Sequence, residues 1–555
     1  MEMEVEGKEE EEMLLQMQQL RFKASELFLR EEWHDCIDAY SHFISLSQPF
    51  LSAAQSQPHH DEQQQDKLKK WLCLALSNRA EARRRLRHLS AALLDCNHAI
   101  QIDATHYKSL LFKGTILLDL DRYSAASDCF KRGLQLHTSD ALQGLLDRCK
   151  KLDFQSRTGA FDLSDWVLNG FRGKSPELAE FVGPVEIKRS EDGSGGRQRG
   201  LFATKDLEAG ALLVMTKPVA IGRAILPDSG DDCRESARII MWKDFVAKVL
   251  EAAGRSRKTL QLIYALSTGE DEQGLRVPDL NLFRPETKES CFGEEKEGEE
   301  EIPDMGRILK ILDVNSTTED GTSATVLGKK DSSLYGVGLW ILPSFINHSC
   351  NPNARRLHIG DHMAVHTSRD VKAGEEITFA YFDVLLPLKK RRELSRAWGF
   401  CCSCKRCRFE DEFRYGEELK EIEMRVENEL LGDRGRGEIV VGLEQSMKRW
   451  MVKGKERGFL RASFWSAFSA TFKCQREMRR WGRRIPPPAT AAECAVEAVG
   501  GDERVVSLVV DAWKKGGVSM DMEDLVMKLG RGIYGKVIRK KAMRALLEQS
   551  LLQQQ

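Results

Sequence analysis

The stretch Asn347-His348-Ser349-Cys350-Asn351-Pro352-Asn353 is the most specific pattern in the chain, and Gly374-Glu375-Glu376-Ile377-Thr378-Phe379-Ala380-Tyr381 follows it. Around both stretches, residues 185–382 contain short β-branched runs broken by glycine, as at residues 211–215. Such runs indicate small sheets, because β-branched side chains fit a pleated, half-buried surface. We therefore expect a β-rich domain at residues 160–385.

Four of the 14 cysteines fall within residues 401–407. Cys402, Cys404 and Cys407 have a C-x-C-x2-C spacing, which turns three thiolates toward one point, and tetrahedral zinc needs a fourth ligand. In a reducing compartment such a cluster indicates a metal site rather than disulfides. Cys401 is then a spare thiol, and the alternative is that the whole group consists of buried structural cysteines.

Four motifs in this order resemble the SET domain of protein lysine methyltransferases. The first is Arg199-Gly200-Leu201-Phe202-Ala203-Thr204-Lys205-Asp206 with Gly210, the next two are the stretches quoted above, and the last is residues 400–407. The layout is most similar to the SET-and-MYND branch. Between residues 221 and 334, however, only Cys233 and Cys291 occur, too few thiols for a MYND finger with two zinc ions, so we predict no MYND domain.

The resemblance implies transfer of a methyl group from S-adenosylmethionine to a lysine side-chain amine of a protein substrate, histone or non-histone. It implies that Tyr381 is the catalytic tyrosine and that Phe400 stacks on the adenine. The remaining residues that it implies for donor binding, partly through their backbone, are Arg199, Gly200, Leu201, Asn347 and His348, with Asn315 as an additional candidate contact. Without the motifs, Phe400, His348 and Tyr381 would each be read as structural residues.

The resemblance also supplies Cys350 as the fourth zinc ligand beside Cys402, Cys404 and Cys407. Bound Zn²⁺ would then fasten the post-SET segment, residues 386–410, to the Asn347-His348 stretch and make the order of the segment depend on the metal. The first motif departs from the family at Gln198, where a glycine is common. Because glycine permits close backbone approach, Gln198 narrows the donor site unless Gly193, Gly195 and Gly196 relieve the turn.

This departure and a large acidic insertion keep a second hypothesis open, namely a catalytically inactive SET/tetratricopeptide adaptor that acts as a protein-interaction scaffold. The insertion, residues 285–333, contains an acidic run and a Ser/Thr/Gly/Asp stretch. We expect it to be mobile around one short helix near residues 307–312. Beyond the cysteines, residues 411–555 return to apolar positions at helical spacing, as at Leu525, Val526, Leu529 and Ile533, and predict a helical C-terminal region.

Residues 14–150 contain a helical repeat. The pattern of small residues recurs after 34 residues, with Ala80, Ala92, Cys96 and Ala99 followed by Gly114, Ala126, Phe130 and Gly133. An earlier copy matches at an offset of 56, because residues 47–67 form an insertion. The unit resembles the tetratricopeptide repeat, which implies an α-solenoid of three repeats that binds protein partners or serves as a scaffold without a ligand. Asn78 and Lys108 resemble a clamp for acidic C-termini, but Ser25 and Phe112 depart from it.

Composition excludes several classes of function. The 84 Lys and Arg residues balance the 85 Asp and Glu residues, so we expect no direct binding of nucleic acid. The sequence contains no run of about 18 apolar residues, so we expect no membrane-spanning helix. The acidic first residues argue against a secretory signal, so we expect residence in the nucleus, the cytoplasm or both. The fold class expected is an α+β multidomain chain with an α-solenoid N-terminus, a β-rich SET domain with a zinc-binding tail, and a helical C-terminal region.

Overall fold

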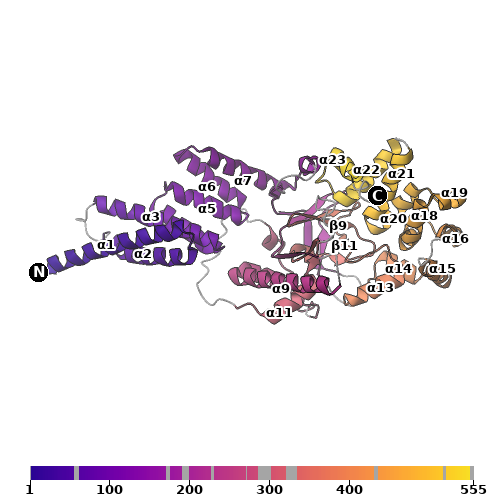
Figure 1. Cartoon of the computed structure of the whole chain (residues 1–555), viewed down its shortest axis with the longest axis horizontal. Coiled ribbons are helices and arrows are strands. Elements are labelled where there is room, and N and C mark those ends of the chain that lie inside the picture. Colours follow the sequence, from indigo (N-terminus) through magenta and orange to yellow (C-terminus); the bar gives the residue numbers. More distant parts are fainter. Residues whose placement is uncertain are drawn as a thin grey trace. The chain divides into compact units, whose positions relative to one another are not determined.

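The computed structural model describes residues 2–54, 62–169, 176–190, 199–226, 231–270, 272–284, 302–319, 334–429, 436–516 and 520–549. Two compact units contain the described residues, the first up to residue 157 and the second from residue 158 onward (Figure 1). Within the described ranges, no helix has both the length and the apolar character needed to cross a bilayer.

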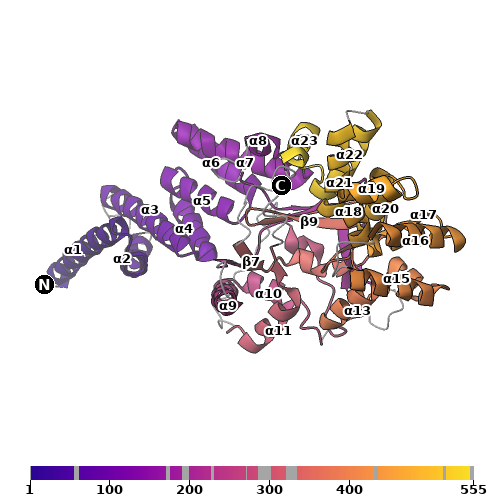
Figure 2. The ribbon, with the colours of Figure 1, turned by 45° about the vertical axis from the view of Figure 1, so that its right-hand side comes forward.

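The first unit consists of helices that pair with their neighbours in sequence, as Figures 1 and 2 show in indigo and violet. They are α1 (Glu2–Leu29), α2 (Trp33–Ala54), α3 (Glu62–Arg85), α4 (Leu89–Ile102), α5 (Tyr107–Asp119), α6 (Tyr123–Leu136) and α7 (Asp140–Thr158). The predicted insertion therefore lengthens α2 and α3 at their facing ends. Residues 55–61 between them lie outside the described residues.

Backbone geometry confirms the three predicted repeats. The turns inside the pairs α1/α2, α3/α4 and α5/α6 each contain one residue in the left-handed region: Glu31 (φ 60°), Arg87 (φ 64°) and Asp121 (φ 58°). In each turn the next amide donates to the carbonyl five residues earlier, at 3.0, 2.8 and 2.8 Å, which is the helix-ending Schellman pattern. These residues are 56 and then 34 positions apart, the same offsets as in the side-chain repeat.

Close helix packing explains why small residues recur. A Cβ on Gly114 would lie 2.4 Å from a ring carbon of Phe130, so the third repeat accommodates a buried phenylalanine only because residue 114 has no side chain. In the preceding repeat the equivalent residues, Ala80 and Cys96, are both fully buried. The two repeats therefore fill the same space in different ways. One has alanine facing cysteine, and the other has glycine facing phenylalanine.

The residues that resemble an acidic-terminus clamp bond to one another. Lys108 Nζ donates to Asn78 Oδ1 at 2.6 Å, and Asn78 Nδ2 donates to the Tyr40 hydroxyl at 2.7 Å. Ser25 Oγ lies 3.4 Å from that hydroxyl. The four side chains thus form one internal polar chain that joins α1, α2, α3 and α5.

The second unit contains three small sheets. The first has the order β1-β4-β10-β9, with β1 (Phe181–Val182), β4 (Leu212–Thr216), β10 (His362–Thr367) and β9 (Ala354–Ile359). The second has the order β2-β3-β11-β8, with β2 (Val185–Arg189), β3 (Arg199–Ala203), β11 (Glu376–Phe379) and β8 (Asn347–His348). The third has the order β5-β7-β6, with β5 (Ile221–Ile225), β7 (Leu334–Gly338) and β6 (Thr317–Thr318). The predicted β-rich domain is confirmed.

The parallel pairing of β8 with β11 decides the position of the site. Asn347 pairs with Thr378, and His348 pairs with Phe379. The pairing therefore brings the two quoted stretches together, so that Tyr381, just beyond β11, lies beside His348. On its other side β11 pairs with β3, where Ile377 lies opposite Leu201. Three of the four sequence motifs thus share one sheet.

Helices cover the sheets. The SET-side helices are α8 (Ser164–Leu168), α9 (Asp231–Arg255), α10 (Arg257–Tyr264), η1 (Leu280–Phe283), α11 (Met305–Asn315) and η2 (Leu342–Phe345). The C-terminal helices are α13 (Leu388–Ala397), α14 (Lys405–Asp411), α15 (Gly416–Glu429), α16 (Arg436–Arg449), α17 (Gly454–Ser463), α18 (Trp465–Lys473), α19 (Gln475–Trp481), α20 (Pro488–Val499), α21 (Glu503–Gly516), α22 (Met520–Tyr534) and α23 (Lys540–Gln549). The short helix predicted near residues 307–312 is α11, and the helical C-terminal region is confirmed, whereas the flanking insertion residues 285–301 and 320–333 lie outside the described residues.

The C-terminal helices share a core with the first sheet. The amide of Lys536 donates to the Gly210 carbonyl at 2.9 Å, and Arg355 Nη1 donates to the Gly501 carbonyl at 2.7 Å. One continuous apolar cluster includes Leu357 and Ala364 of the sheet together with Val505, Val526 and Tyr534 of the helices. The sheet and the C-terminal helices therefore stabilise each other.

A buried histidine lies at this junction and makes stability depend on pH. His366 of β10 is 1% exposed, and a Cβ on Gly535 would lie 2.9 Å from its ring. Burial, assisted by the nearby Arg355, lowers the pKa of His366 to about 4. Because the unfolded histidine (about 6.5) binds the proton first, acidification from about pH 6.5 to 4 removes up to about 3 kcal/mol from the free energy of unfolding.

We predict that His366→Asn reduces this pH dependence. Urea unfolding of the full chain at several pH values between 7 and 4.5 measures the slope of the unfolding free energy for both proteins. His362→Asn, at the other end of β10, is the matched control. Equal slopes for the wild type and His366→Asn would show that this imidazole does not carry the effect.

Candidate functional site

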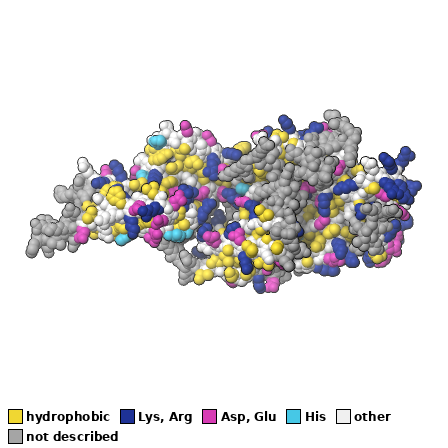
Figure 3. Space-filling view, in the orientation of Figure 1, with side chains coloured by type: hydrophobic (Ala, Val, Ile, Leu, Met, Phe, Trp, Pro, Cys, Tyr) yellow, Lys and Arg dark blue, Asp and Glu magenta, His cyan; other side chains and the backbone are white. Residues whose placement is uncertain are grey.

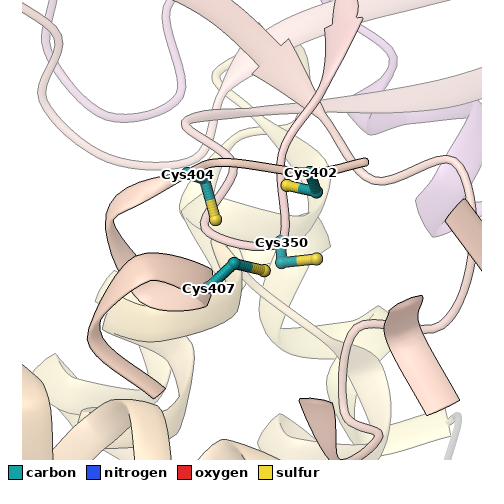
Figure 4. Close-up of side chains that lie close together, drawn as sticks. All are labelled: Cys350, Cys402, Cys404 and Cys407. Carbon is teal, nitrogen blue, oxygen red and sulfur yellow. The ribbon is translucent and has the colours of Figure 1, made fainter. Parts of the chain in front are cut away.

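The four cysteines predicted as metal ligands lie together (Figure 4). Cys350 follows β8, Cys402 and Cys404 lie on the loop before α14, and Cys407 is in its first turn. Their Sγ atoms are all within 4.8 Å of one another, and Cys350 and Cys407 are buried. Zn–S bonds of about 2.3 Å place tetrahedral sulfurs about 3.8 Å apart. The donor set therefore fits a structural Zn²⁺ ion, whereas the adjacent Cys401 is exposed and outside the group.

The four cysteine thiols are close enough to shift one another's pKa in opposite directions. The pKa of Cys350 is lowered because Cys402, Cys404 and Cys407 donate hydrogen bonds to its sulfur. The pKa of Cys407 is raised because Cys350, Cys402 and Cys404 hold its proton between sulfurs. Metal ligation requires thiolates, and the hydrogen bonds that lower the pKa of Cys350 favour the thiolate form of this cysteine.

A buried ionic network holds the cysteine loop in place. Arg391 and Arg406, both with 0% exposed side chains, pair with Glu410, which is 1% exposed. Arg391 Nη1 also donates to Cys407 Sγ at 3.1 Å, and Arg406 Nη1 donates to the Cys350 carbonyl at 3.2 Å. Ser463 of α17 completes the network, because its hydroxyl accepts from Arg406 at 2.7 Å and donates to Glu410 at 3.0 Å. The network therefore joins the cysteines to the C-terminal helices.

We predict that Glu410→Gln destabilises the second unit by about 3–5 kcal/mol, because two buried guanidinium groups would lose their carboxylate, and Arg391 would keep only the Cys407 sulfur. Thermal unfolding of the full chain followed by circular dichroism measures the loss. Glu412→Gln, which removes an exposed carboxylate two residues further on, is the control and should leave the transition unchanged. If the two variants unfold alike, the network does not stabilise the fold.

Tyr381 lies among aromatic rings. Its ring centroid is 5.3 Å from that of Trp398, 5.4 Å from His348, 5.6 Å from Phe379 and 6.0 Å from Phe400. Its hydroxyl donates to the Ile346 carbonyl at 2.8 Å, and burial raises its pKa. The phenol is therefore neutral at physiological pH, and its oxygen keeps a lone pair available to a further group.

His348 connects Tyr381 to the cysteines. Its Nδ1 accepts a hydrogen bond from the Tyr381 amide at 3.0 Å, so the ring proton is on Nε2, which lies 3.3 Å from Cys350 Sγ. The ring also stacks on Phe382 at 4.3 Å and lies 5.4 Å from Phe400. Cys350, His348 and Tyr381 thus form one connected unit, in which the histidine contacts both neighbours.

Asn347 and Gly200 belong to a second polar group. Asn347 Nδ2 donates to Glu376 Oε1 at 2.7 Å and to the Arg199 carbonyl at 3.1 Å. A Cβ on Gly200 would lie 2.6 Å from Glu376 Oε1. A side chain at residue 200 would therefore displace the Glu376 carboxylate, which occupies the space where that side chain would begin.

The Arg199 side chain is structural. It is 2% exposed and pairs with Glu272, with an Nε–Oε1 distance of 2.7 Å, and the Arg199 amide donates to the same oxygen at 3.0 Å. Nη1 donates to the Ala265 carbonyl at 2.6 Å, and Phe345 lies under the guanidinium. The ion pair thereby fastens residues 265–272, after α10, to the start of β3.

Two other predicted contacts are also occupied within the protein. Leu201 is fully buried in β3. Asn315 Nδ2 donates to the carbonyls of Ser267 and Ile311 at 2.8 and 2.7 Å, so it closes the end of α11 against residue 267. Gln198, together with Gly193, Gly195 and Gly196, lies outside the described residues. For these positions the predicted donor-binding roles remain predictions.

Comparison with known proteins identifies the domain that carries this site. The family model described as the SET domain matches residues 198–382, which include β3, β8, β11 and Tyr381. This part of the chain is a SET domain. The four cysteines combine one residue of the domain, Cys350, with three from the segment that follows it.

Relatives of the SET domain are methyltransferases by name. A protein of Gibberella zeae named "Methyltransferase" is 27% identical over 362 residues, 60% of this chain and 46% of that protein. Histone-lysine N-methyltransferase SMYD3 of Homo sapiens is 40% identical over 77 residues, 14% of this chain and 18% of its own. The chain thus spans less than half of the length of these relatives. Among solved structures, the Arabidopsis OM64 TPR domain is similar over 24% of this chain and 94% of its own, with 21% identity and a TM-score of 0.20.

Several residues of the site were missed by sequence reasoning. Glu376 stands inside a quoted motif, and Trp398 precedes Phe400 by two residues, so proximity in sequence could have suggested both. Glu272, which pairs with Arg199, lies 73 residues away from it and gives no signal. Arg391, Arg406 and Glu410 look like ordinary solvated helix charges in the sequence, whereas in the structure they are buried.

Proposed function

We propose that this protein is an S-adenosylmethionine-dependent protein-lysine methyltransferase. The observation that carries the proposal is the SET family match over residues 198–382, inside which β8 and β11 place Tyr381 against His348 in an aromatic surround. The names of the relatives support methyl transfer, and histone-lysine methyltransferases among them support a lysine of a protein as the acceptor. Four mutually close thiols support a structural zinc ion beside the site.

The residues around Tyr381 suit the acceptor amine. A lysine ammonium has no lone pair and an ordinary pKa of about 10.4, so it must lose a proton before it attacks. Apolar rings disfavour the charged form and lower the pKa of an amine held among them. Trp398 is 46% exposed while Phe379 is buried, so the aromatic surround extends from the surface inward.

Tyr381 acts by position rather than as a base in this proposal. Its hydroxyl proton is committed to the Ile346 carbonyl, and its raised pKa excludes a phenolate at neutral pH. The phenolic oxygen and nearby backbone carbonyls can accept weak polar contacts from a methyl group that becomes more positive during transfer. Bound S-adenosylmethionine supplies that methyl group; Phe400, Asn347, His348 and the backbone of residues 199–201 would hold it.

The first unit is proposed to bind protein partners. Its repeated helix pairs build the elongated surface that α-solenoids use for recognition. The alternative, a scaffold without catalysis, predicts the same binding but no donor affinity.

One experiment separates the two. Titration calorimetry of the full chain with S-adenosylmethionine, followed by transfer of labelled methyl groups to histones and to a cell lysate, tests donor binding and activity in turn. Saturable donor binding and a labelled protein band whose label is recovered in methyllysine support the proposal. No measurable donor binding by a folded, zinc-loaded chain would favour the scaffold.

A further inference from the structure

An open groove lies next to the end of the SET domain. It encloses about 580 Å³ between residues 383–386, which follow Tyr381, and the C-terminal helices α16 and α18. The apolar side chains Leu385 and Leu386 line one part, and Ser466, Ser469 and Ala470 of α18 line another. Asp383 is paired with Arg504 at 2.8 Å, so the acidic group of the lining is already neutralised.

Donors without acceptors line the same groove. Trp465 is 3% exposed, and its indole Nε1 has no hydrogen-bond partner; the same holds for Nε of Arg436 at the start of α16. Lys473, at the end of α18, is exposed, and neither it nor Arg436 has a carboxylate partner within the ranges that the structure describes. The lining therefore offers an anionic ligand two cationic side chains, Arg436 and Lys473, that have no carboxylate partner among the described residues.

A strip of arginines continues from the groove. Beyond Lys473 and Cys474, α19 and the following turn present exposed guanidinium groups at Arg476, Arg479, Arg480, Arg483 and Arg484. None of them forms an ion pair with a described residue, and the Glu477 carboxylate is taken by the Gly437 amide at 3.1 Å. Two of the arginines flank Trp481, at 4.7 and 5.5 Å from its ring. Figure 3 shows dark blue side chains gathered over the end of the molecule where Figure 1 labels α19.

We propose that the groove and this arginine strip together bind an acidic segment of a protein partner. Carboxylates pair with Arg436, with Lys473 and with the exposed guanidinium groups of the strip, which have no carboxylate partner among the described residues. The apolar walls at Leu385 and Leu386 accept the aliphatic parts of a polypeptide. A seven-residue helix is only about 10 Å long, too short a strip to follow a nucleic-acid backbone with many phosphate contacts, so a peptide fits better.

Binding, and not methyl transfer, tests this proposal, so its outcome is independent of the proposed activity. Fluorescence anisotropy measures the affinity of the full chain for a labelled oligoglutamate peptide, with labelled oligoglutamine and oligothymidylate as comparisons. We expect saturable binding of oligoglutamate that weakens as salt rises, and none of oligoglutamine. Tighter binding of oligothymidylate than of oligoglutamate would overturn the proposal in favour of nucleic acid.

Matched variants locate the binding surface. Arg479→Gln/Arg483→Gln should weaken oligoglutamate binding about tenfold, whereas Lys205→Gln/Lys243→Gln, which removes the same charge from exposed positions of the SET domain, should change it less than about twofold. Lys473→Gln removes the exposed cation of the groove lining and should also weaken oligoglutamate binding. Equal effects of the two double variants, in chains with unchanged circular dichroism, would overturn the proposal.

Discussion

Tyr381→Phe should reduce methyl transfer by about 100- to 1,000-fold while leaving affinity for S-adenosylmethionine within about threefold of the wild type. The change removes one oxygen from a ring that four aromatic neighbours hold in place, so the shape of the site persists. What disappears is the hydroxyl bonded to the Ile346 carbonyl, together with the lone pair that would face the reacting groups. Single-turnover assays with labelled donor measure transfer, and calorimetry measures binding.

Tyr335→Phe is the matched control, because it removes a phenolic oxygen from β7, in a different sheet of the same domain. It should change transfer less than about twofold. Equal rates for Tyr381→Phe and the wild type would remove Tyr381 from the mechanism. A loss of donor affinity as large as the loss of rate would instead indicate that the hydroxyl maintains the binding site and takes no part in transfer.

The pH dependence of transfer should also exclude Tyr381 as a general base. Burial raises the pKa of the phenol above its ordinary value of about 10, so its ionisation falls outside the usual assay range. Any rise of rate with pH below 9 should therefore persist in Tyr381→Phe, because it reports deprotonation of the substrate amine. A pH profile that becomes flat in this variant would contradict the positioning role.

The cysteine cluster was predictable from sequence because its chemistry is local. Three ligands lie within six residues, from Cys402 to Cys407, and the motif around Cys350 supplied the fourth. The structure brings the four sulfurs together. The repeats were predictable for a related reason, since close packing between helices leaves a periodic trace of small residues such as Ala80 and Gly114.

The interactions that hold the site in place were not predictable, because each partner comes from a distant segment. The backbone of Arg199 is predicted to contact the donor, but nothing in the sequence shows that its side chain pairs with Glu272, because only the tertiary fold brings Ala265 and Glu272 to β3. Arg391, Arg406 and Glu410 have the spacing of surface ion pairs on α13 and α14, and nothing local shows that α17 buries them. The spacing of apolar residues along a sequence indicates which face of a helix or strand is apolar. It does not indicate whether another helix buries the charged face.

The groove beside α18 was predictable from sequence only in part. Its arginines form a basic run at residues 476–484 of the sequence. The net charge of the whole chain is near zero and does not indicate this local run. That the run adjoins an open groove depends on how α16, α18 and residues 383–386 pack. The expectation of no nucleic-acid binding rested on net charge alone, so the anisotropy comparison also tests it.

Cys404→Ser should release the bound metal and weaken donor binding together. A serine hydroxyl is a poor zinc ligand, and structural zinc sites contribute about 10–16 kcal/mol of apparent binding free energy, so loss of one of four thiolates leaves a site that a chelator empties readily. Phe400 lies two residues before Cys402, and its ring is 5.4 Å from that of His348, whose Nε2 faces Cys350. Once the metal no longer fixes the loop, we expect Phe400 and His348 to lose their orientation.

Atomic emission spectroscopy of the dialysed protein measures the metal, and calorimetry measures donor affinity, which we expect to fall at least about tenfold. Cys401→Ser is the matched control, because Cys401 is adjacent in sequence but exposed and outside the cluster. It should retain one zinc ion per chain and wild-type affinity. Unchanged metal content in Cys404→Ser would refute the ligand assignment, whereas loss of metal with unchanged donor affinity would separate the zinc site from the donor site and refute the coupling through His348.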